Sequence, residues 1–263
     1  MMANRELEAL LSLSFRSMGR EIQEMRAARS VDERSTVLRV LEGESIVRFG
    51  DSELLHAYLN WSPHRFQSPH PALSRELLHT IDHADEIDAT GCIVAMPWVT
   101  TRPHWQWVWS KVWDFHQDRL QQTRCLFGDT HSTRPQAFLK FEDIGQLWRS
   151  CWSGRRVTVI SGAGSRFEPV DALFGSAKQI SLLDGVAPTD AFRDLHRLSQ
   201  RALEQRRRTD IYVISLGPTG TILARDLTLA GCTALDVGHL PNSFGHVMSA
   251  APRPEDLPMI REA

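Results

Sequence analysis

The sequence predicts an α/β protein with a Rossmann-like, mainly parallel sheet flanked by helices, and with an N-terminal helical extension. Short apolar, β-prone runs alternate with longer amphipathic stretches, a pattern typical of parallel strands joined by crossover helices. The length of 263 residues suits one large domain, and the apolar fraction of 42% is ordinary for a globular protein. Each glycine-rich or polar motif follows a predicted strand, where parallel sheets place ligand sites.

The chain begins with a predicted helix over residues 4–28, in which apolar side chains recur at gaps of three and four. They are Leu7, Leu11, Phe15, Met18, Ile22 and Met25. We expect this helix to dock on the main domain, although a homodimer contact is an alternative. After a break at Ser30, Asp32 opens a second helix that runs to Leu41, with Gly43 just beyond its end. Residues 1–42 therefore form the predicted extension.

The main domain is predicted over residues 43–249. Its strands are short runs rich in Ile, Val and Leu, each closed by Gly, Pro or a polar residue. They are predicted at 45–49, 91–96, 156–160, 179–183, 210–215 and 233–237. Helical periodicity predicts the intervening helices at 54–59, 72–87, 105–120, 139–151, 191–205 and from about 220 to 230. Residues 60–71 are a predicted loop, and the Pro-rich tail over 250–263 is expected to be loose.

The charge balance excludes some classes of protein. Thirty basic residues face 32 acidic ones, a net charge of -2, which argues against a protein that coats nucleic acid. Only three of the basic residues are lysines, and guanidinium groups are well shaped for planar anions such as phosphate. No apolar stretch is long enough for a membrane span, and no signal-peptide core is present. The four cysteines are scattered along the chain, so we expect them to be reduced thiols, which predicts a cytoplasmic protein.

The first motif of chemical interest is Arg48-Phe49-Gly50-Asp51-Ser52-Glu53, at the end of the first predicted strand. Asp51 and Glu53 can both reach one ion, and divalent cations commonly share carboxylate oxygens with substrate phosphates. The alternative is an acidic turn in which Asp51 caps the following helix.

Two further motifs follow later strands. Ser215–Thr221 is a strand, a Gly/Thr loop and a helix start, which suits a phosphate or simply a capped turn. Asp236-Val237-Gly238-His239 places an acid and an imidazole at a strand end, where they can move a proton or serve a structural role.

Weaker signals come from Thr133-Arg134-Pro135 and Ser161–Arg166. Arg134 can pair with a phosphate or be solvated, and the two glycines of Ser161–Arg166 give only slight support for NAD binding. A group of tryptophans includes Trp105, Trp109 and Trp113 on one helical face, which predicts core or a lipid- or partner-facing surface, with sugar stacking secondary.

Taken together, these motifs resemble the bacterial glycosyltransferases of the GT-D fold, long catalogued as a domain of unknown function. The resemblance covers roughly residues 45–244. It rests on Arg48–Glu53, Gln67, Thr133–Pro135, Ser165–Phe167, Asp171–Phe174, Gly217–Thr219 and Asp236–His239, in that order along the chain. The family usually has Gly-Asp-Gly-Glu, whereas Ser52 stands here at the second glycine. A serine can follow the same path when its φ is negative.

The resemblance implies transfer of a sugar from a nucleotide-sugar donor, with a UDP-sugar as first choice, to a hydroxyl of a glycan or glycoconjugate. It implies that Asp51 and Glu53 hold a divalent metal, Mn²⁺ or otherwise Mg²⁺, on the diphosphate. Donor binding is expected from Arg48, Gly50, Gln67, Arg134, Arg166, Gly217, Pro218 and Thr219. The candidates for the catalytic base are Asp236 and His239.

Two other functions compete with this hypothesis. The first is a non-catalytic module that binds a nucleotide or sugar phosphate, and the second, weaker one is an NAD-dependent oxidoreductase based on Gly162–Gly164. No nucleic acid partner is expected. Peripheral association with the inner membrane surface is compatible with the tryptophans.

Overall fold

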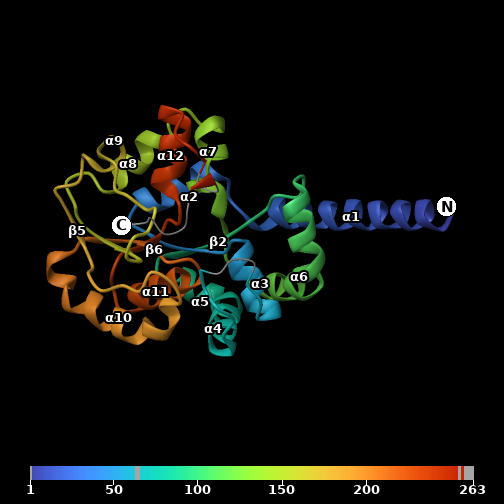
Figure 1. Cartoon of the computed structure of the whole chain (residues 1–263), viewed down its shortest axis with the longest axis horizontal. Coiled ribbons are helices and arrows are strands. Elements are labelled where there is room, and N and C mark those ends of the chain that lie inside the picture. Colours follow the sequence, from blue (N-terminus) through green and yellow to red (C-terminus); the bar gives the residue numbers. More distant parts are fainter. Residues whose placement is uncertain (1, 63–65, 254–255, 258–263) are drawn as a thin grey trace.

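The computed structural model shows a sheet of seven parallel strands between two layers of helices (Figure 1). It describes residues 2–62, 66–253 and 256–257, of which 2–14 are described by their backbone alone. The strand order is β3-β2-β1-β7-β6-β4-β5. The strands are β1 (Ser45–Arg48), β2 (Cys92–Met96), β3 (Gly128–Asp129), β4 (Arg156–Ser161), β5 (Gln179–Leu182), β6 (Ile211–Ser215) and β7 (Ala234–Asp236). The predicted α/β class and parallel sheet are confirmed.

Helices cover both faces of the sheet. One face carries α1 (Met2–Arg29), α3 (Asp51–Leu59), α4 (Pro71–Asp82), α5 (Ala84–Asp88), α6 (Pro103–Gln122), α10 (Leu195–Glu204) and α11 (Pro218–Leu229). The other carries α2 (Glu33–Leu41), α7 (Pro135–Lys140), α8 (Ile144–Cys151), α9 (Asp171–Phe174) and α12 (Leu240–Ser249). Short 3₁₀ turns occupy Thr130–Thr133, Ala191–Asp194 and Arg206–Arg208.

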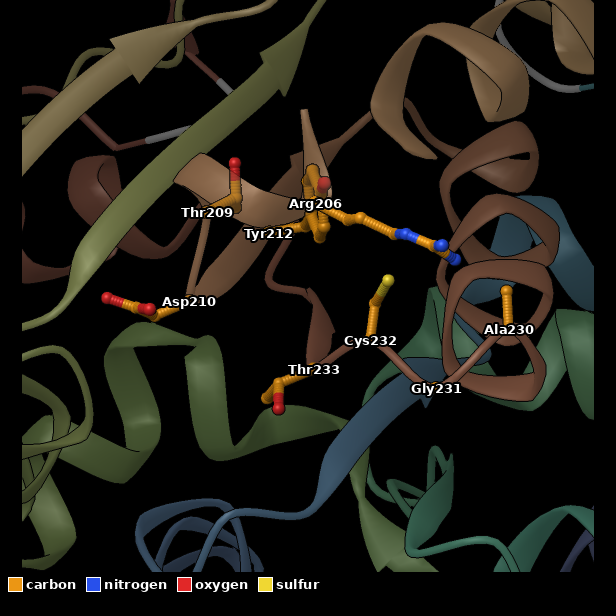
Figure 2. A pocket seen from close by; sticks show the side chains of 8 residues that line it. All are labelled: Arg206, Thr209, Asp210, Tyr212, Ala230, Gly231, Cys232 and Thr233. Carbon is orange, nitrogen blue, oxygen red and sulfur yellow. The ribbon is translucent and has the colours of Figure 1, made fainter. Parts of the chain in front are cut away.

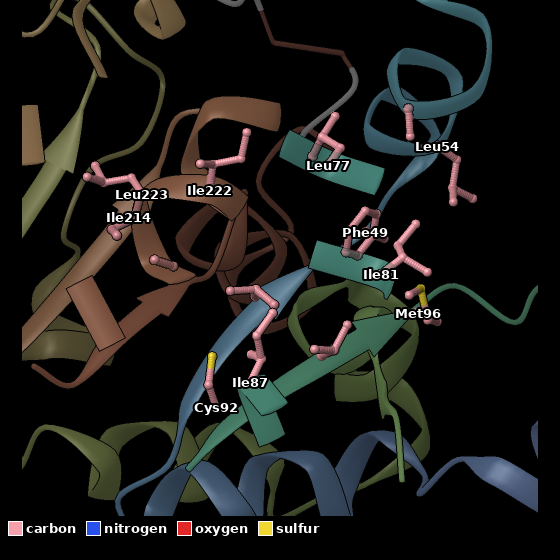
Figure 3. Close-up of a cluster of buried hydrophobic side chains, with 14 of the residues drawn as sticks. Phe49, Leu54, Leu77, Ile81, Ile87, Cys92, Met96, Ile214, Ile222 and Leu223 are labelled. Atoms are coloured by element: carbon pink, nitrogen blue, oxygen red, sulfur yellow. The ribbon is translucent and has the colours of Figure 1, made fainter. Parts of the chain in front are cut away.

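Two apolar cores hold these layers together. Side chains alternate along β1, so that Ile46 enters one core whereas Val47 and the following Phe49 enter the other. Figure 3 shows Phe49 against Leu77 and Ile81 of α4, all without solvent exposure. Each such side chain contributes roughly 1.5–3 kcal/mol when fully buried. The two cores fix the sheet, and with it the positions of the loops at its edges.

The second half of α1 docks on the main domain. Ile22 is fully buried, and Met18 and Met25 pack beside it. The indole Nε1 of Trp113 donates a hydrogen bond to Glu21 Oε2 at 3.1 Å. The first half of α1 extends away from the body of the molecule (Figure 1). The predicted docking is therefore confirmed for the second half, and the homodimer contact stays a prediction.

Several element boundaries differ from those predicted. The expected helix over 72–87 is interrupted at His83, whose ψ of 25° leaves the helical range, and two helices result. The expected helix over 139–151 begins only at Ile144, because extended Phe141 separates α8 from α7. The segments α7, α9, α12 and β3 were not predicted as elements. Each is short or carries a proline in its first turn, which leaves little periodicity to detect.

The C-terminal tail contacts the main domain at Leu257. Part of the expected loose tail, at residues 254–255 and 258–263, lies outside the described residues, whereas the Leu257 carbonyl accepts a hydrogen bond from Arg166 Nη1 at 2.9 Å. In the described part of the chain, no helix combines the length and apolarity needed to cross a bilayer.

Candidate functional site

The predicted site residues gather at the carboxyl edge of the two central strands. β1 and β7 are parallel neighbours, with Ile46 opposite Leu235. Because parallel strands end on the same side, Arg48 and Asp236 meet at one edge. The loops after these strands carry the acidic pair on one side and His239 on the other.

The acidic pair opens α3. Gly50 is the N-cap residue, and its N–H donates to Glu53 Oε2 at 2.8 Å, the return contact of a capping box. Asp51 is therefore the first helical residue rather than the cap, which corrects the alternative weighed from the sequence. Ser52 lies inside the helix and has a negative φ, so the serine takes the glycine's place without strain.

Asp236 fixes the end of β1. The Thr221 hydroxyl lies 2.9 Å from the Arg48 carbonyl oxygen and 3.2 Å from Asp236 Oδ2. Nε of Arg48 lies 3.8 Å from Asp236 Oδ1, and its Nη1 donates to Thr133 Oγ1 at 2.8 Å. The Asp236 side chain is 3% exposed. The Arg48 guanidinium is thus hydrogen-bonded to Thr133 and lies close enough to Asp236 for electrostatic attraction.

The carboxylates of this edge repel one another. Burial, followed by the charges of Asp236 and Asp51, raises the pKa of Glu53 to about 7. Burial also raises the pKa of Asp236, against the lowering effect of Arg48. Such a cluster favours the arrival of a positive charge.

The donor set fits a divalent cation only in part. Among the described residues, no three His, Cys, Asp or Glu side chains are arranged as a preformed cage. Two carboxylates completed by phosphate oxygens are, however, the usual donor set for Mg²⁺ at phosphate sites. Asp51 and Glu53 supply carboxylates of this kind, although Glu53 Oε2 already accepts the Gly50 N–H.

His239 lies among arginines. Its Nε2 faces Arg166 Nη2 at 2.9 Å, and since a guanidinium can only donate, Nε2 accepts. Burial and the charges of Arg134, Arg166 and Arg48 lower the pKa of His239 well below its usual value. Its Nδ1 is buried without a hydrogen-bond partner in the described structure. The imidazole is therefore neutral near pH 7 and a weak proton acceptor.

The predicted phosphate loop is closed by a contact with Gln67. The Thr219 hydroxyl donates to Gln67 Oε1 at 3.0 Å, which places residues 66–68 over the start of α11. Gly217 has a φ of +53°, and a Cβ there would lie 3.2 Å from Phe66. Pro218 and Thr219 are buried. This group joins the central edge through Thr221, two residues further along α11.

Of the two remaining predicted motifs, the one with Arg134 belongs to the candidate site and the one with Gly162 does not. Arg134 occupies the position just before α7, and its effect on the pKa of His239 places it in the central group. Close packing within the fold accounts for a glycine at position 162, because a Cβ there would lie 2.9 Å from the Ala187 carbonyl oxygen. This contact removes the main reason to expect a dinucleotide at Gly162–Gly164.

A pocket at the opposite edge contains none of the predicted site residues. Figure 2 shows Asp210 and Thr233 in its lining, just before β6 and β7 begin. Asp210 is paired with Arg156 at 2.6 Å, a contact that ties two neighbouring strands together.

Sequence reasoning missed two members of the site. Thr221 joins Arg48 to Asp236, and its signal is its place at the end of the Ser215–Thr221 motif. His104 Nε2 lies 2.9 Å from Asp51 Oδ2, and this hydrogen bond raises the pKa of His104. The sequence does indicate this residue, because His104 follows Pro103 at the start of a helix that comes after a strand.

These features define a Rossmann-like α/β domain whose carboxyl edge combines three acidic residues with three arginines. Comparison with known proteins narrows this class. A model of the family "Glycosyltransferase GT-D fold" matches residues 46–254, and the chain belongs to this family. The resemblance predicted from the motifs is confirmed.

Two relatives named as glycosyltransferases agree with this family assignment. The chain is 26% identical to Glycosyltransferase GlyD of Streptococcus pneumoniae over 76% of its length, and 26% identical to the probable glycosyl transferase Gly of Streptococcus gordonii over 77%. It spans 25% and 30% of the length of these relatives.

The structural neighbours show the same fold. One described as domain of unknown function 1792 with a distinct glycosyltransferase fold has a TM-score of 0.76 at 21% identity, over 95% of this chain and 90% of the neighbour. Another, described as a new glycosyltransferase (DUF1792) from Streptococcus sanguinis, has a TM-score of 0.71 at 23% identity, over 85% of each chain.

Proposed function

We propose that this chain is a metal-dependent glycosyltransferase domain that moves a sugar from a nucleotide-sugar donor to a hydroxyl of a glycan or glycoconjugate acceptor. A UDP-sugar is the proposed donor. One observation carries the proposal: an acidic pair and three arginines meet at the carboxyl edge of β1 and β7, around His239. A diphosphate with a divalent cation has the complementary charges for such an edge.

Asp51 and Glu53 are the proposed metal residues, with Mn²⁺ as first choice and Mg²⁺ as the alternative. When bound, the cation would neutralise charge that develops on the diphosphate leaving group. Arg48 acts on the same charge, and its fixed orientation between Asp236 and Thr133 means that it need not reorganise during transfer. Arg134 and Arg166 supply further positive charge.

The acceptor hydroxyl must lose a proton. Of the two predicted bases, Asp236 has a raised pKa and His239 a lowered one, so Asp236 is the proposed proton acceptor. His239 is then a neutral group that is oriented by Arg166 and offers its Nδ1–H to the substrate. Gln67, Gly217, Pro218 and Thr219 shape the wall beside the donor, with Gly50 in the turn that aims the acidic pair.

A thermal-shift panel of UDP, GDP, CMP and NAD, each with and without Mn²⁺, tests the proposal together with hydrolysis of UDP-sugars. We expect UDP to raise Tm only with Mn²⁺, and UDP-sugars to be hydrolysed slowly. Stabilisation by NAD without metal would support the oxidoreductase instead. Nucleotide binding without turnover of any sugar nucleotide would favour the non-catalytic module.

The state of the cysteines bears on the compartment in which the protein works. Cys92, Cys125, Cys151 and Cys232 are free thiols, and the first three are buried. A reducing compartment suits them, so we propose that the domain works in the cytoplasm, at the inner membrane surface where its acceptor is membrane-bound.

A further inference from the structure

Two exposed tryptophans stand beside the candidate site. The chain has eight tryptophans, most of which are buried in the cores. Trp61 and Trp107 are 43% and 40% exposed. Their ring centroids lie 5.7 Å apart at an interplanar angle of 67°, so that one indole edge meets the other indole face.

A continuous series of contacts joins this pair to the acidic pair. The ring centroids of His104 and Trp107 lie 6.3 Å apart, and His104 Nε2 lies 2.9 Å from Asp51 Oδ2. The His104 side chain is half exposed. The contacts therefore lead from the Asp51 carboxylate to the His104 imidazole and then to the indoles of Trp107 and Trp61.

The two tryptophans come from separate parts of the fold. Trp61 follows α3 directly, after Asn60 turns the chain with a φ of +46°. Trp107 lies in the second turn of α6, one turn beyond His104. Trp109 and Trp113 of the same helix are buried, so Trp107 does not serve the core.

We infer that Trp61, His104 and Trp107 form the subsite for a pyranose ring of the acceptor. This inference rests on the proposed glycosyltransferase function. Indole faces pack against the C–H face of a sugar ring, while an exposed imidazole beside them exchanges hydrogen bonds with its hydroxyls. The contact with Asp51 sets this subsite next to the reacting centre.

The composition of the patch favours a sugar over a lipid surface. A membrane-binding patch has a wide apolar area bordered by cations. Here the two indoles adjoin His104 and Asp51, which is the polar and aromatic mixture that a carbohydrate requires. Binding to a lipid surface is therefore the competing explanation that the experiment must separate from glycan binding.

Glycan-array binding identifies the probe, and saturation-transfer NMR with the captured oligosaccharide measures its affinity. We expect Trp61→Ala and Trp107→Ala to weaken this affinity by roughly five- to ten-fold, the effect of losing one aromatic contact. Trp107→Phe retains an aromatic face and should restore most of it. Phe115→Ala removes a 65% exposed ring of the same helix and is the matched control, expected to bind like the wild type.

The UDP- and Mn²⁺-dependent rise in Tm is measured for every variant. Its absence in the wild type contradicts the proposed function, whereas its retention with loss of glycan binding supports the subsite. The inference is overturned if the wild type captures no glycan, or if both alanine variants retain full affinity. It is equally overturned if the alanine variants lose only binding to phosphatidylglycerol vesicles.

Discussion

The guanidinium of Arg48 lies over the backbone of Gly238, in the space that a side chain at position 238 would need. Gly238 also has a φ of +50°, in the left-handed region that glycine favours. Gly238, which follows β7, therefore determines where the side chain of Arg48, the last residue of β1, can lie. No local sequence pattern links the two positions.

Gly238→Ala should displace Arg48 and weaken binding of UDP with Mn²⁺. We expect a stability loss of about 1–3 kcal/mol from strain and contact together. Gly231→Ala is the matched control, because its φ is also positive, at +81°, but no atom lies within 4 Å of a Cβ there. Equal losses of stability and of nucleotide affinity in both variants would contradict a role for the Arg48 contact. Denaturation and nucleotide titration measure the difference.

Removing the acidic pair should abolish the metal response. In Asp51→Asn and Glu53→Gln we expect loss of the Mn²⁺-dependent rise in Tm with UDP, and a fall in kcat of about 100-fold or more. Glu142→Gln, an exposed acid at another surface, should behave like the wild type. Variants of the acidic pair that keep metal-dependent hydrolysis would remove the basis for the proposed site.

Stability of the metal-free protein should fall as pH rises. The pKa of Glu53 is about 7 in the fold against an ordinary value of 4.5, so the folded state holds a proton more tightly than the unfolded state. This contribution is complete below the ordinary pKa and is lost as pH passes about 7. The loss should be on the order of 1–3 kcal/mol. Urea denaturation across this range should show a flatter profile for Glu53→Gln; parallel profiles would contradict the assignment.

Loss of a neighbouring positive charge should make His239 more basic. Arg166→Ala is expected to raise the pKa of His239, because both the hydrogen bond to Nε2 and a repulsive charge disappear. Arg166→Lys retains the charge and should give a smaller rise. Titration of the histidine Cε1 resonances by NMR, with His239→Asn for assignment, measures both. An unchanged pKa in Arg166→Ala would show that Arg166 does not set the protonation of His239.

The contact between Gln67 and Thr219 should couple the two residues energetically. Gln67→Ala and Thr219→Val should each destabilise the protein by about 1 kcal/mol. The double variant should be less destabilised than the sum, with a coupling of roughly 0.5–1.5 kcal/mol. Full additivity in denaturation would mean that the hydrogen bond of 3.0 Å does not hold the loop.

The sheet was predictable because each strand is a self-contained run of apolar residues. The local sequence alone predicts strands at Val157–Ile160 and Ile211–Ile214. The glycine or polar motif after each strand marks the carboxyl edge of the sheet. The two-residue β3 is an exception. It exists because Gly128 pairs with Ala95 on a neighbouring strand, a tertiary cause that leaves no pattern in its own segment.

The candidate site was predictable residue by residue but not contact by contact. Asp51, Asp236 and Arg48 could be found from their places at or just after the ends of strands. That the Thr221 hydroxyl lies near both Arg48 and Asp236, or that His104 reaches Asp51, depends on which strands become neighbours. The strand order is fixed by the packing of the whole chain, so local periodicity does not contain it.

The pairing of β1 with β7 also has a consequence for folding. Ile46 and Leu235 stand near opposite ends of the chain, and their pairing closes nearly the entire domain into one loop. During synthesis, Arg48 emerges long before Asp236 and Gly238 exist to orient it. A chain that ends before residue 234 would therefore carry the acidic pair without the strand that completes its surroundings.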